Sequence, residues 1–325
     1  MISSSSLLLA ALLFLLSDSV ISLQIPILER SYTYPNKFGR HNIRYTEALG
    51  TGSKAPVVCV HGFGGNADQY RKNLPYWSEC GHNAYAIDLL GYGYSSKPNP
   101  REYNVNEIYN FETWGSQTIH FLENVVNEPA VLVCNSIGGL VGLIAAIKRP
   151  DLVKGVVLIN MSLRMLHTEK QSPFQRPITS AIQTLLRETS IGKNFFSQVA
   201  KLDVIKNILS QAYNSVENNV DDETVALILK PGLEEGAAEV FLDFISYSGG
   251  PLPEDLLRDC KVPVRILWGE NDNWEPIKLG REFANYECVD KFVPLKDAGH
   301  CPMDQVPDQV NSEVIKYLEV VGRKN

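Results

Sequence analysis

Short runs of apolar residues alternate along this chain with longer segments in which apolar residues recur every three or four positions. Uniform short runs are typical of strands buried on both faces, and the longer period is typical of amphipathic helices. Because the two kinds alternate, the pattern predicts an α/β fold with a mostly parallel, eight-stranded sheet flanked by helices. The predicted core strands are residues 56–60, 84–87, 130–134, 155–159, 264–268 and 291–294, a hairpin at 32–34 and 43–46 precedes them, and the clearest helices are 106–126 and 138–148.

One interval interrupts this alternation. Residues 162–253 contain no predicted strand but hold several amphipathic helical stretches, such as 178–186 and 204–212. An insertion of about ninety residues is too long for a loop without structure of its own. The pattern therefore predicts a helical lid, inserted between two halves of the core at residues 46–161 and 254–325.

The N-terminal residues 1–22 differ from the rest of the chain. Residues 7–16 read LLLAALLFLL, which is too short for a bilayer span of about 20 residues but suits the apolar region of a signal peptide. An uncleaved apolar anchor is the alternative. Residues 23–45 are predicted as an N-terminal extension with the first strand, and their excess of basic residues is also typical of a short transit segment.

Composition and charge exclude one class of partner. Of the 325 residues, 44% are hydrophobic and 21% are charged, which is enough apolar material for a folded core. The formal net charge is −7 without any basic run, and this argues against nucleic acids, whose phosphates need clustered Lys and Arg. Since no two histidines are spaced i, i+4 and no Cys/His cluster occurs, we expect no metal site.

The six cysteines are predicted to be free thiols. Cys59 and Cys134 lie inside strand-like apolar runs, where cysteine behaves as a small buried hydrophobe. No Cys-x-x-Cys motif occurs, and a chain of this length needs no disulfide to fold. A glycosylation sequon at residues 160–162 closes another apolar run and is predicted to be inaccessible.

The central candidate for chemistry is Ser136, within Val-Leu-Val-Cys-Asn-Ser-Ile-Gly-Gly at residues 131–139. An apolar strand ends, the serine follows, and a helix opens at once with two glycines. This is the arrangement of a nucleophile elbow, whose usual form is Gly-x-Ser-x-Gly. Cys134 stands in place of the first glycine and is small enough for the turn. A serine that merely caps a core helix is the alternative.

A glycine-rich loop follows the predicted strand at residues 56–60. It reads His-Gly-Phe-Gly-Gly from His61 onward. Loops at this place supply a backbone N–H to the oxyanion of a tetrahedral intermediate, and one such donor is worth about 3–4 kcal/mol in other enzymes. We assign this role to the N–H groups of Phe63 and Ile137 and a structural role to His61. The glycine spacing fits neither a dinucleotide-binding turn nor a P-loop.

The predicted base and acid come late in the chain. His300 follows the last predicted strand in Ala-Gly-His, and Asp272 lies in the loop after the strand before it. The order Ser136, Asp272, His300 fits an enzyme in which the imidazole accepts the serine proton and the carboxylate fixes its tautomer. Three other acids stay open as alternatives: Glu270, Asp297 and, more distantly, Asp243.

Several longer stretches carry a resemblance to a known family. They are AIDLLGYG at 86–93, CNSIGGLV at 134–141, LINMSLRMLH at 158–167, YSGGPLPEDLL at 247–257 and DAGHCP at 297–302. Together with the motifs above they resemble the α/β-hydrolase superfamily, and they are similar to its pheophytinase and chlorophyll dephytylase group of plants and algae. The resemblance implies hydrolysis of the phytyl ester of chlorophyll or pheophytin in plastids without a cofactor. By matching positions it implies Ser136 as nucleophile, Asp272 as acid and His300 as base.

A phytyl ester needs an apolar groove, because removing a hydrocarbon from water contributes about 0.8 kcal/mol per CH₂. The lid and the residue before it are the natural place for that groove. The alternative for any apolar residue on a helix is that it packs in the core. The candidate substrate-binding residues are Met161, Leu163, Met165, Phe241 and Phe244.

The sequence thus predicts a serine hydrolase that cleaves the carboxylic ester of a hydrophobic molecule, and we expect peripheral contact with membranes. Two alternatives stay open. One is a general carboxylesterase or lipase, and the other is a ligand receptor that retains the fold without turnover. The expected location is a plastid reached through a signal-peptide route, as in algae with complex plastids, with secretion or the ER lumen as the alternative.

Overall fold

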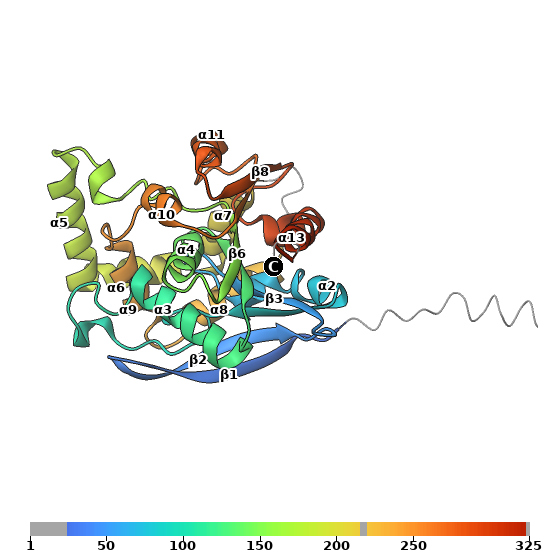
Figure 1. Cartoon of the computed structure of the whole chain (residues 1–325). Helices are drawn as coiled ribbons and strands as arrows, with labels where there is room; N and C mark the ends of the chain where they lie inside the picture. Colours follow the sequence, from blue (N-terminus) through green and yellow to red (C-terminus); the bar gives the residue numbers. More distant parts are fainter. Residues whose placement is uncertain (1–24, 215–219, 323–325) are drawn as a thin grey trace, which may run out of the picture.

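The computed structural model describes residues 25–214 and 220–322 (Figure 1), so the predicted targeting segment at 1–22 lies outside the described residues. Eight strands form one sheet in the order β1-β2-β4-β3-β5-β6-β7-β8. The pairs β1–β2 and β2–β4 are antiparallel, and all other neighbours are parallel. The predicted α/β sheet is therefore confirmed. The strands are β1 Leu28–Asn36, β2 Gly39–Ala48, β3 Lys54–Val60, β4 His82–Ile87, β5 Ala130–Asn135, β6 Val153–Ile159, β7 Val264–Gly269 and β8 Val289–Leu295.

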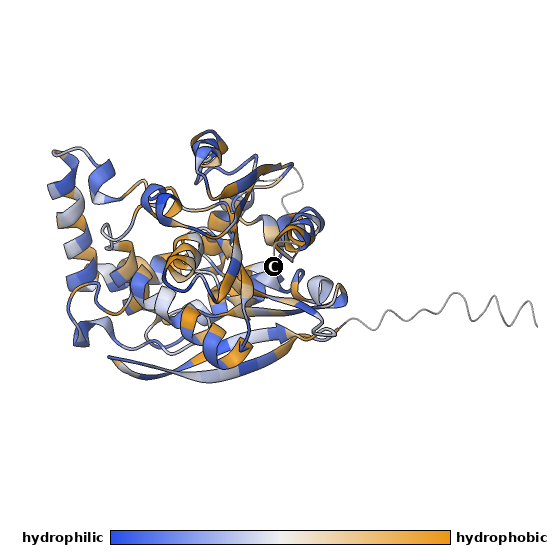
Figure 2. Cartoon of the chain, viewed as in Figure 1, coloured by the Kyte–Doolittle hydropathy of each residue, from blue (hydrophilic) through white to orange (hydrophobic). Residues whose placement is uncertain are grey.

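Helices cover both faces of the sheet, because the side chains of a strand alternate between its faces. Leu132 of β5 packs in one apolar layer with α3, α4 and α10, and Val133 packs in the opposite layer with α2, α12 and α13. Figure 2 shows hydrophobic residues concentrated on the central strands and on α4. The bounds of the core helices are α2 Leu74–Glu79, α3 Phe111–Phe121, α4 Gly138–Lys148, α10 Pro253–Asp259, α11 Ile277–Gly280, α12 Pro302–Gln305 and α13 Pro307–Gly322.

The helix predicted at 106–126 begins later than expected. Asn110 caps it by accepting a hydrogen bond from the Thr113 backbone N–H at 2.9 Å, so α3 starts at Phe111. A π-helical turn over Leu122–Val126 extends it, and Asn127 ends it with a left-handed backbone. The side-chain cap and not the apolar period decides where this helix starts.

The stretch 23–45, considered above as a transit segment, is largely built into the sheet. Residues 28–36 and 39–48 form β1 and β2, and Ile43 is fully buried. Arg44 lies within 2.7 Å of Asp68 and 3.4 Å of Asp88 across the sheet edge. Cleavage after residue 45 would remove β1 and most of β2, which argues against a removable segment here.

The insertion between β6 and β7 is helical, and its outermost helix, α5, stands at the edge of the molecule in Figure 1. Four large apolar residues of this region, Phe174, Ile178, Ile182 and Leu185, are exposed at helical spacing. Among the described helices, none is long and apolar enough to cross a bilayer. The insertion consists of a short 3₁₀ turn at Thr168–Lys170, α5 Gln175–Glu188, α6 Ser190–Val199, α7 Leu202–Tyr213, α8 Asp222–Gly232 and α9 Ala237–Ile245.

Candidate active site

Ser136 lies at the sharp turn between β5 and α4. Its backbone is in the left-handed region, with φ 54°, which is uncommon and strained for a residue with a Cβ atom. The Ser136 N–H donates to the carbonyl of Ile159 at 2.9 Å. A Cβ atom on Gly138 would lie 2.6 Å from the carbonyl oxygens of Val60 and His61. Only glycine therefore lets α4 begin this close to the loop after β3.

The cysteine two residues before Ser136 is accommodated by a glycine on the facing helix. A Cβ atom on Gly142 of α4 would lie 2.5 Å from Cys134 Sγ, and Cys134 is fully buried. In the usual motif a glycine at position 134 would leave this space empty. Here the side chain is on the strand and the small residue is on the helix, so the close approach of β5 and α4 is retained.

His300 and Asp272 meet through a buried hydrogen bond between Nδ1 and Oδ2, 2.8 Å long. The other carboxylate oxygen, Oδ1, accepts from the backbone N–H groups of Trp274 at 2.9 Å and Glu275 at 3.0 Å. Because an ionised carboxylate can only accept, it holds the proton on Nδ1 of His300. The Nε2 atom is then left as an acceptor for a hydroxyl proton.

Two cavities share a wall that includes Ser136 and His300, together with Phe63 and Trp274. The first, of about 370 Å³, has polar and charged side chains in its lining, and we call it the polar cavity. The second, of about 310 Å³, is lined almost wholly by carbon, and we call it the apolar cavity. The polar cavity includes Arg164, His167, Gln183, Ser248 and Glu275, and the apolar cavity includes Phe195, Val199, Ile205, Ile208, Leu209 and Phe241.

The two backbone donors assigned to an oxyanion lie beside the serine. Phe63 and Ile137 both line the polar cavity with Ser136. Neither of their N–H groups donates a hydrogen bond to another group in the part of the chain that the structure describes. Ile137 directly follows Ser136, and a Cβ atom on Gly62, next to Phe63, would lie 2.9 Å from Ser136 Cβ. The loop and the elbow are thus close enough to present both amides at one place.

Residues 57–313 match the alpha/beta hydrolase family. The chain belongs to this family. It is 25% identical over 275 residues to the uncharacterized hydrolase YugF of Bacillus subtilis, covering 85% of this chain and 94% of YugF. It is 27% identical over 327 residues to the chloroplastic pheophytinase of Arabidopsis thaliana, covering 86% of this chain and 65% of that protein. A thermophilic esterase from Thermogutta terrifontis has the same fold, with a TM-score of 0.69 at 20% identity over 91% of this chain and 99% of the esterase.

Of the four acids considered for this hydrolase, Asp272 alone contacts His300. Glu270 and Asp297 are exposed to solvent. Asp243 is buried on α9, where it pairs with Arg187 at 2.8 Å. Of these four, Asp272 is therefore the one that the loop after β7 brings to His300.

Asn160 is a site residue that the sequence analysis missed. Its Nδ2 donates to Asp272 Oδ2 at 2.6 Å and to the carbonyl of Gly299 at 3.2 Å, while its Oδ1 accepts from the Gly269 N–H at 3.0 Å. It is fully buried, which confirms that the sequon is inaccessible. The signal that could have revealed it is a polar residue directly after a buried parallel strand, at the sheet edge where ligands bind.

Trp274 is a second residue at the site that no sequence motif indicated. Its ring lies 5.1 Å from the His300 ring between centroids, and it lines both cavities. Only its place two residues after Asp272 could have suggested a role, because the contact with His300 is set by the loop conformation.

His61 has the structural role that we expected. Leu89 donates its backbone N–H to Nε2 at 3.0 Å, so Nδ1 carries the proton and donates to the Gly62 carbonyl at 2.8 Å. Complete burial lowers the pKa of His61 to about 4. The imidazole is thus neutral and engaged at both nitrogens, and it braces the loop that carries Phe63.

The five residues proposed for substrate binding lie in four different places. Met165 and Phe244 line the polar cavity, and Phe241 lines the apolar one. The prediction for Met161 was wrong, because its side chain is fully buried in the core against Gly139 at the start of α4. The prediction for Leu163 was also wrong, since this residue lines a separate cavity that does not include Ser136.

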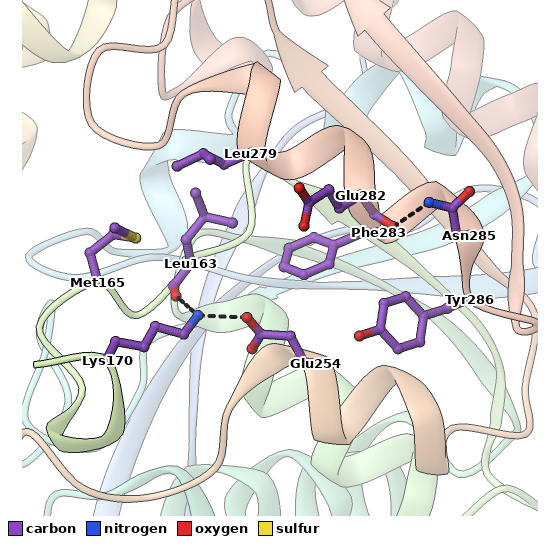
Figure 3. A pocket seen from close by; sticks show the side chains of 9 residues that line it. All are labelled: Leu163, Met165, Lys170, Glu254, Leu279, Glu282, Phe283, Asn285 and Tyr286. Atoms are coloured by element: carbon purple, nitrogen blue, oxygen red, sulfur yellow. Dashed lines mark hydrogen bonds and ion pairs between the residues drawn. The ribbon is translucent and has the colours of Figure 1, made fainter.

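Figure 3 shows the residues that line that separate cavity. Its volume of about 700 Å³ exceeds that of either cavity beside Ser136. Lys170 lines this cavity, where it pairs with Glu254 at 2.6 Å and donates to the Leu163 carbonyl at 2.7 Å. None of the three predicted catalytic side chains lines it. Size alone therefore does not locate the site, and Met165 is the residue shared between this cavity and the polar one.

Two further features of the described residues concern the cysteines and the side chains that could bind a metal ion. All six cysteines are free thiols in the structure. Within residues 25–214 and 220–322, no group of three or more His, Cys, Asp and Glu side chains is arranged to hold a metal ion.

Proposed function

We propose that this hydrolase is a serine esterase that cleaves the carboxylic ester of a hydrophobic substrate, most specifically the phytyl ester of chlorophyll or pheophytin. The observation that carries the proposal is the position of Ser136. It sits on a left-handed turn and opens on the same cavities as His300, whose Nδ1 is held by Asp272.

The geometry supports a reaction in two halves. Ser136 Oγ attacks the ester carbonyl carbon while Nε2 of His300 takes the hydroxyl proton. The carbonyl oxygen becomes an oxyanion facing the N–H groups of Phe63 and Ile137. The intermediate collapses, the C–O bond to the alcohol breaks, and the alcohol leaves with the proton from His300. Water, deprotonated by the same imidazole, then attacks the acyl carbon. The bond from this carbon to Ser136 Oγ breaks, His300 returns the proton to Oγ, and the carboxylic acid is released.

The apolar cavity supports a long hydrocarbon as one half of the substrate. Side chains from α6, α7 and α9, including Phe195, Leu209 and Phe241, line it next to Ser136. Burying a hydrocarbon chain there contributes about 0.8 kcal/mol per CH₂. The 27% identity to the Arabidopsis pheophytinase favours phytol as the alcohol.

The surface next to the polar cavity favours contact with a lipid phase that dissolves such a substrate. Helix α5 bears the exposed Ile178 and Ile182, while Gln183 of the same helix lines the cavity. Exposed apolar patches of this kind mark interaction surfaces, and amphipathic helices lie at membrane interfaces. We therefore extend the proposal to peripheral binding through α5, which a double change Ile178→Ser, Ile182→Ser should weaken in a vesicle co-sedimentation assay.

Delivery to a complex plastid through the ER is the corresponding proposal for location. Residues 7–16 support it as a signal-type apolar segment. A C-terminally tagged chain found in the culture medium of an algal host would contradict it.

The deciding experiment measures phytol release from chlorophyll a and pheophytin a, with a p-nitrophenyl ester as the simple substrate and Ser136→Ala as the control. Phytol release that Ser136→Ala abolishes supports dephytylation. Fast cleavage of the simple ester without phytol would instead identify a general esterase. Absence of any Ser136 adduct with a fluorophosphonate probe would favour a receptor.

A further inference from the structure

The polar cavity contains a buried positive charge that the proposed mechanism does not use. Arg164 lies five residues after the end of β6, is 9% exposed and lines the cavity together with Ser136 and His300. Its guanidinium group lies over two rings, 4.7 Å from the centroid of Phe111 and 5.4 Å from that of Tyr247. Its Nη2 donates to the Gly249 carbonyl. The guanidinium is therefore held in one position in the wall of the cavity that also includes Ser136.

Arg164 has no carboxylate partner among the described residues: no Asp or Glu oxygen lies within 4.0 Å of it. Glu275 lines the same cavity but forms no ion pair with Arg164. Nη1 and Nε of Arg164 make no hydrogen bond within residues 25–214 and 220–322. A buried charge without a partner is costly unless something else compensates it.

The backbone at Arg164 adds a second cost. Its φ is 54°, in the left-handed region where side chains with a Cβ atom are strained. Strain of this kind is retained where the surrounding structure fixes it, and it clusters at functional sites. Three of the described residues with a left-handed backbone lie at the site. Ser136 and Arg164 line the polar cavity, and Asn160 donates a hydrogen bond to Asp272. The position thus combines local strain with a buried charge that has no ion-pair partner.

We propose that Arg164 is a specificity residue that donates a hydrogen bond to a carbonyl or carboxylate oxygen on the acyl half of the substrate. This inference rests on the proposed esterase function. A guanidinium fork suits oxygen acceptors on planar groups, and its hydrogen bonds are strong because the donor is charged. The apolar cavity takes the hydrocarbon alcohol, and the polar cavity takes an acyl group that bears a further oxygen. The substrate class is therefore an ester joining a long aliphatic alcohol to an oxygen-bearing acid.

The experiment compares three phytyl esters whose acyl groups each have five carbons. Phytyl pentanoate has no further oxygen, phytyl levulinate has a ketone, and phytyl hydrogen glutarate has a carboxylate. Phytol release gives kcat/KM for each ester. A hydrogen bond from a charged donor predicts that the wild-type protein prefers one or both oxygen-bearing esters by about ten- to hundredfold. The levulinate and glutarate arms distinguish a carbonyl from a carboxylate as the preferred group.

Two variants and a matched control separate recognition from folding. Arg164→Met should reduce the preference to below about threefold, while Arg164→Lys, which keeps the charge, should retain part of the preference for the carboxylate. Arg176→Met makes the same chemical change on the exposed start of α5 and should retain the wild-type preference. If Arg164 had only a structural role, its variants would lower all three rates together, and that result would overturn the proposal.

The wild-type protein alone also decides the question. If it cleaves all three esters at the same kcat/KM, the role of Arg164 is refuted while the esterase function stands. If it cleaves none of them but cleaves the p-nitrophenyl ester, the phytyl-ester assignment and the role of Arg164 both fail while the esterase function stands. If it cleaves no ester at all, the esterase function fails too.

Discussion

Replacing Asp272 by asparagine should disable catalysis, because it should reverse the direction of the hydrogen bond at Nδ1 of His300. In the wild-type protein both carboxylate oxygens accept: Oδ2 from His300 Nδ1 and Asn160 Nδ2, and Oδ1 from the N–H groups of Trp274 and Glu275. An asparagine side chain has one oxygen and one NH₂ group. Whichever way it is oriented, its NH₂ group therefore meets groups that also donate.

The structure decides between the two orientations. With the NH₂ group toward Trp274 and Glu275, two fixed backbone donors are left unpaired, at about 1–3 kcal/mol each. With the NH₂ group toward His300, the imidazole can change tautomer and accept at Nδ1, so only the Asn160 donor is left unpaired. The second orientation is favoured by about 1–3 kcal/mol. It places the proton on Nε2, where His300 can no longer accept the proton of Ser136.

We therefore expect Asp272→Asn to lower kcat by about a thousand- to ten-thousandfold, as the same change does in a serine protease with such a triad. KM should change little, because Asp272 does not line either cavity. The free energy of unfolding should fall by about 1–3 kcal/mol from the unpaired Asn160 donor. Initial rates on p-nitrophenyl butyrate and urea titration measure the two effects.

The matched control is Asp297→Asn, the same substitution at an exposed acid three residues before His300. It should retain wild-type kcat, and asparagine tolerates the positive φ of 56° at this position. A kcat for Asp272→Asn within tenfold of the wild-type value would refute the reasoning, as would an equal loss in both variants.

Three further outcomes can be checked separately. Gly142→Ala should lower the free energy of unfolding by about 1–3 kcal/mol in urea titration, because its Cβ atom would lie 2.5 Å from Cys134 Sγ, and adding Cys134→Gly should restore most of the loss. Between pH 6.5 and 4, His61 is protonated in the unfolded chain but stays neutral in the folded protein, so the free energy of unfolding falls as the pH falls. His61→Gln should remove about 3 kcal/mol of this pH dependence, and an unchanged pH slope of stability would contradict the low pKa of His61. Ile208→Trp should fill part of the apolar cavity and lower kcat/KM for long-chain esters by more than about tenfold while acetate esters keep their rate, whereas equal effects on both would show that the chain binds elsewhere.

The sheet could be predicted because its signals are local. Strands such as β5 and β6 are buried on both faces, so they read as continuous apolar runs, and all six predicted core strands are present within a few residues of their expected bounds. Ser136, Asp272 and His300 could be named for a related reason. Each lies in the turn or loop that follows a strand, and the carboxyl ends of parallel strands bring such residues to one edge of the sheet.

The ends of the helices and the roles of the lid residues could be predicted less well from the sequence. The start of α3 depends on one side-chain cap at Asn110. Met161 and Leu163 are apolar residues near the insertion, as expected of a substrate groove, but an apolar residue can serve a groove or the core equally well. Which it does depends on where the neighbouring helices pack, and Met161 packs against Gly139 in the core.

By itself, then, the sequence determined the order of the strands along the chain and the turn at Ser136, and it predicted His300 as the imidazole, because each is written in a short stretch of residues. It left four acids open, and only the structure brings Asp272 to His300. Only the tertiary structure decided that Asn160 supports Asp272 across 112 residues of sequence, that two unlike cavities share Ser136, and that Arg164 is buried without a carboxylate partner. These properties depend on contacts between distant segments, and no local pattern records which side chains will meet or which charge will be left without a partner.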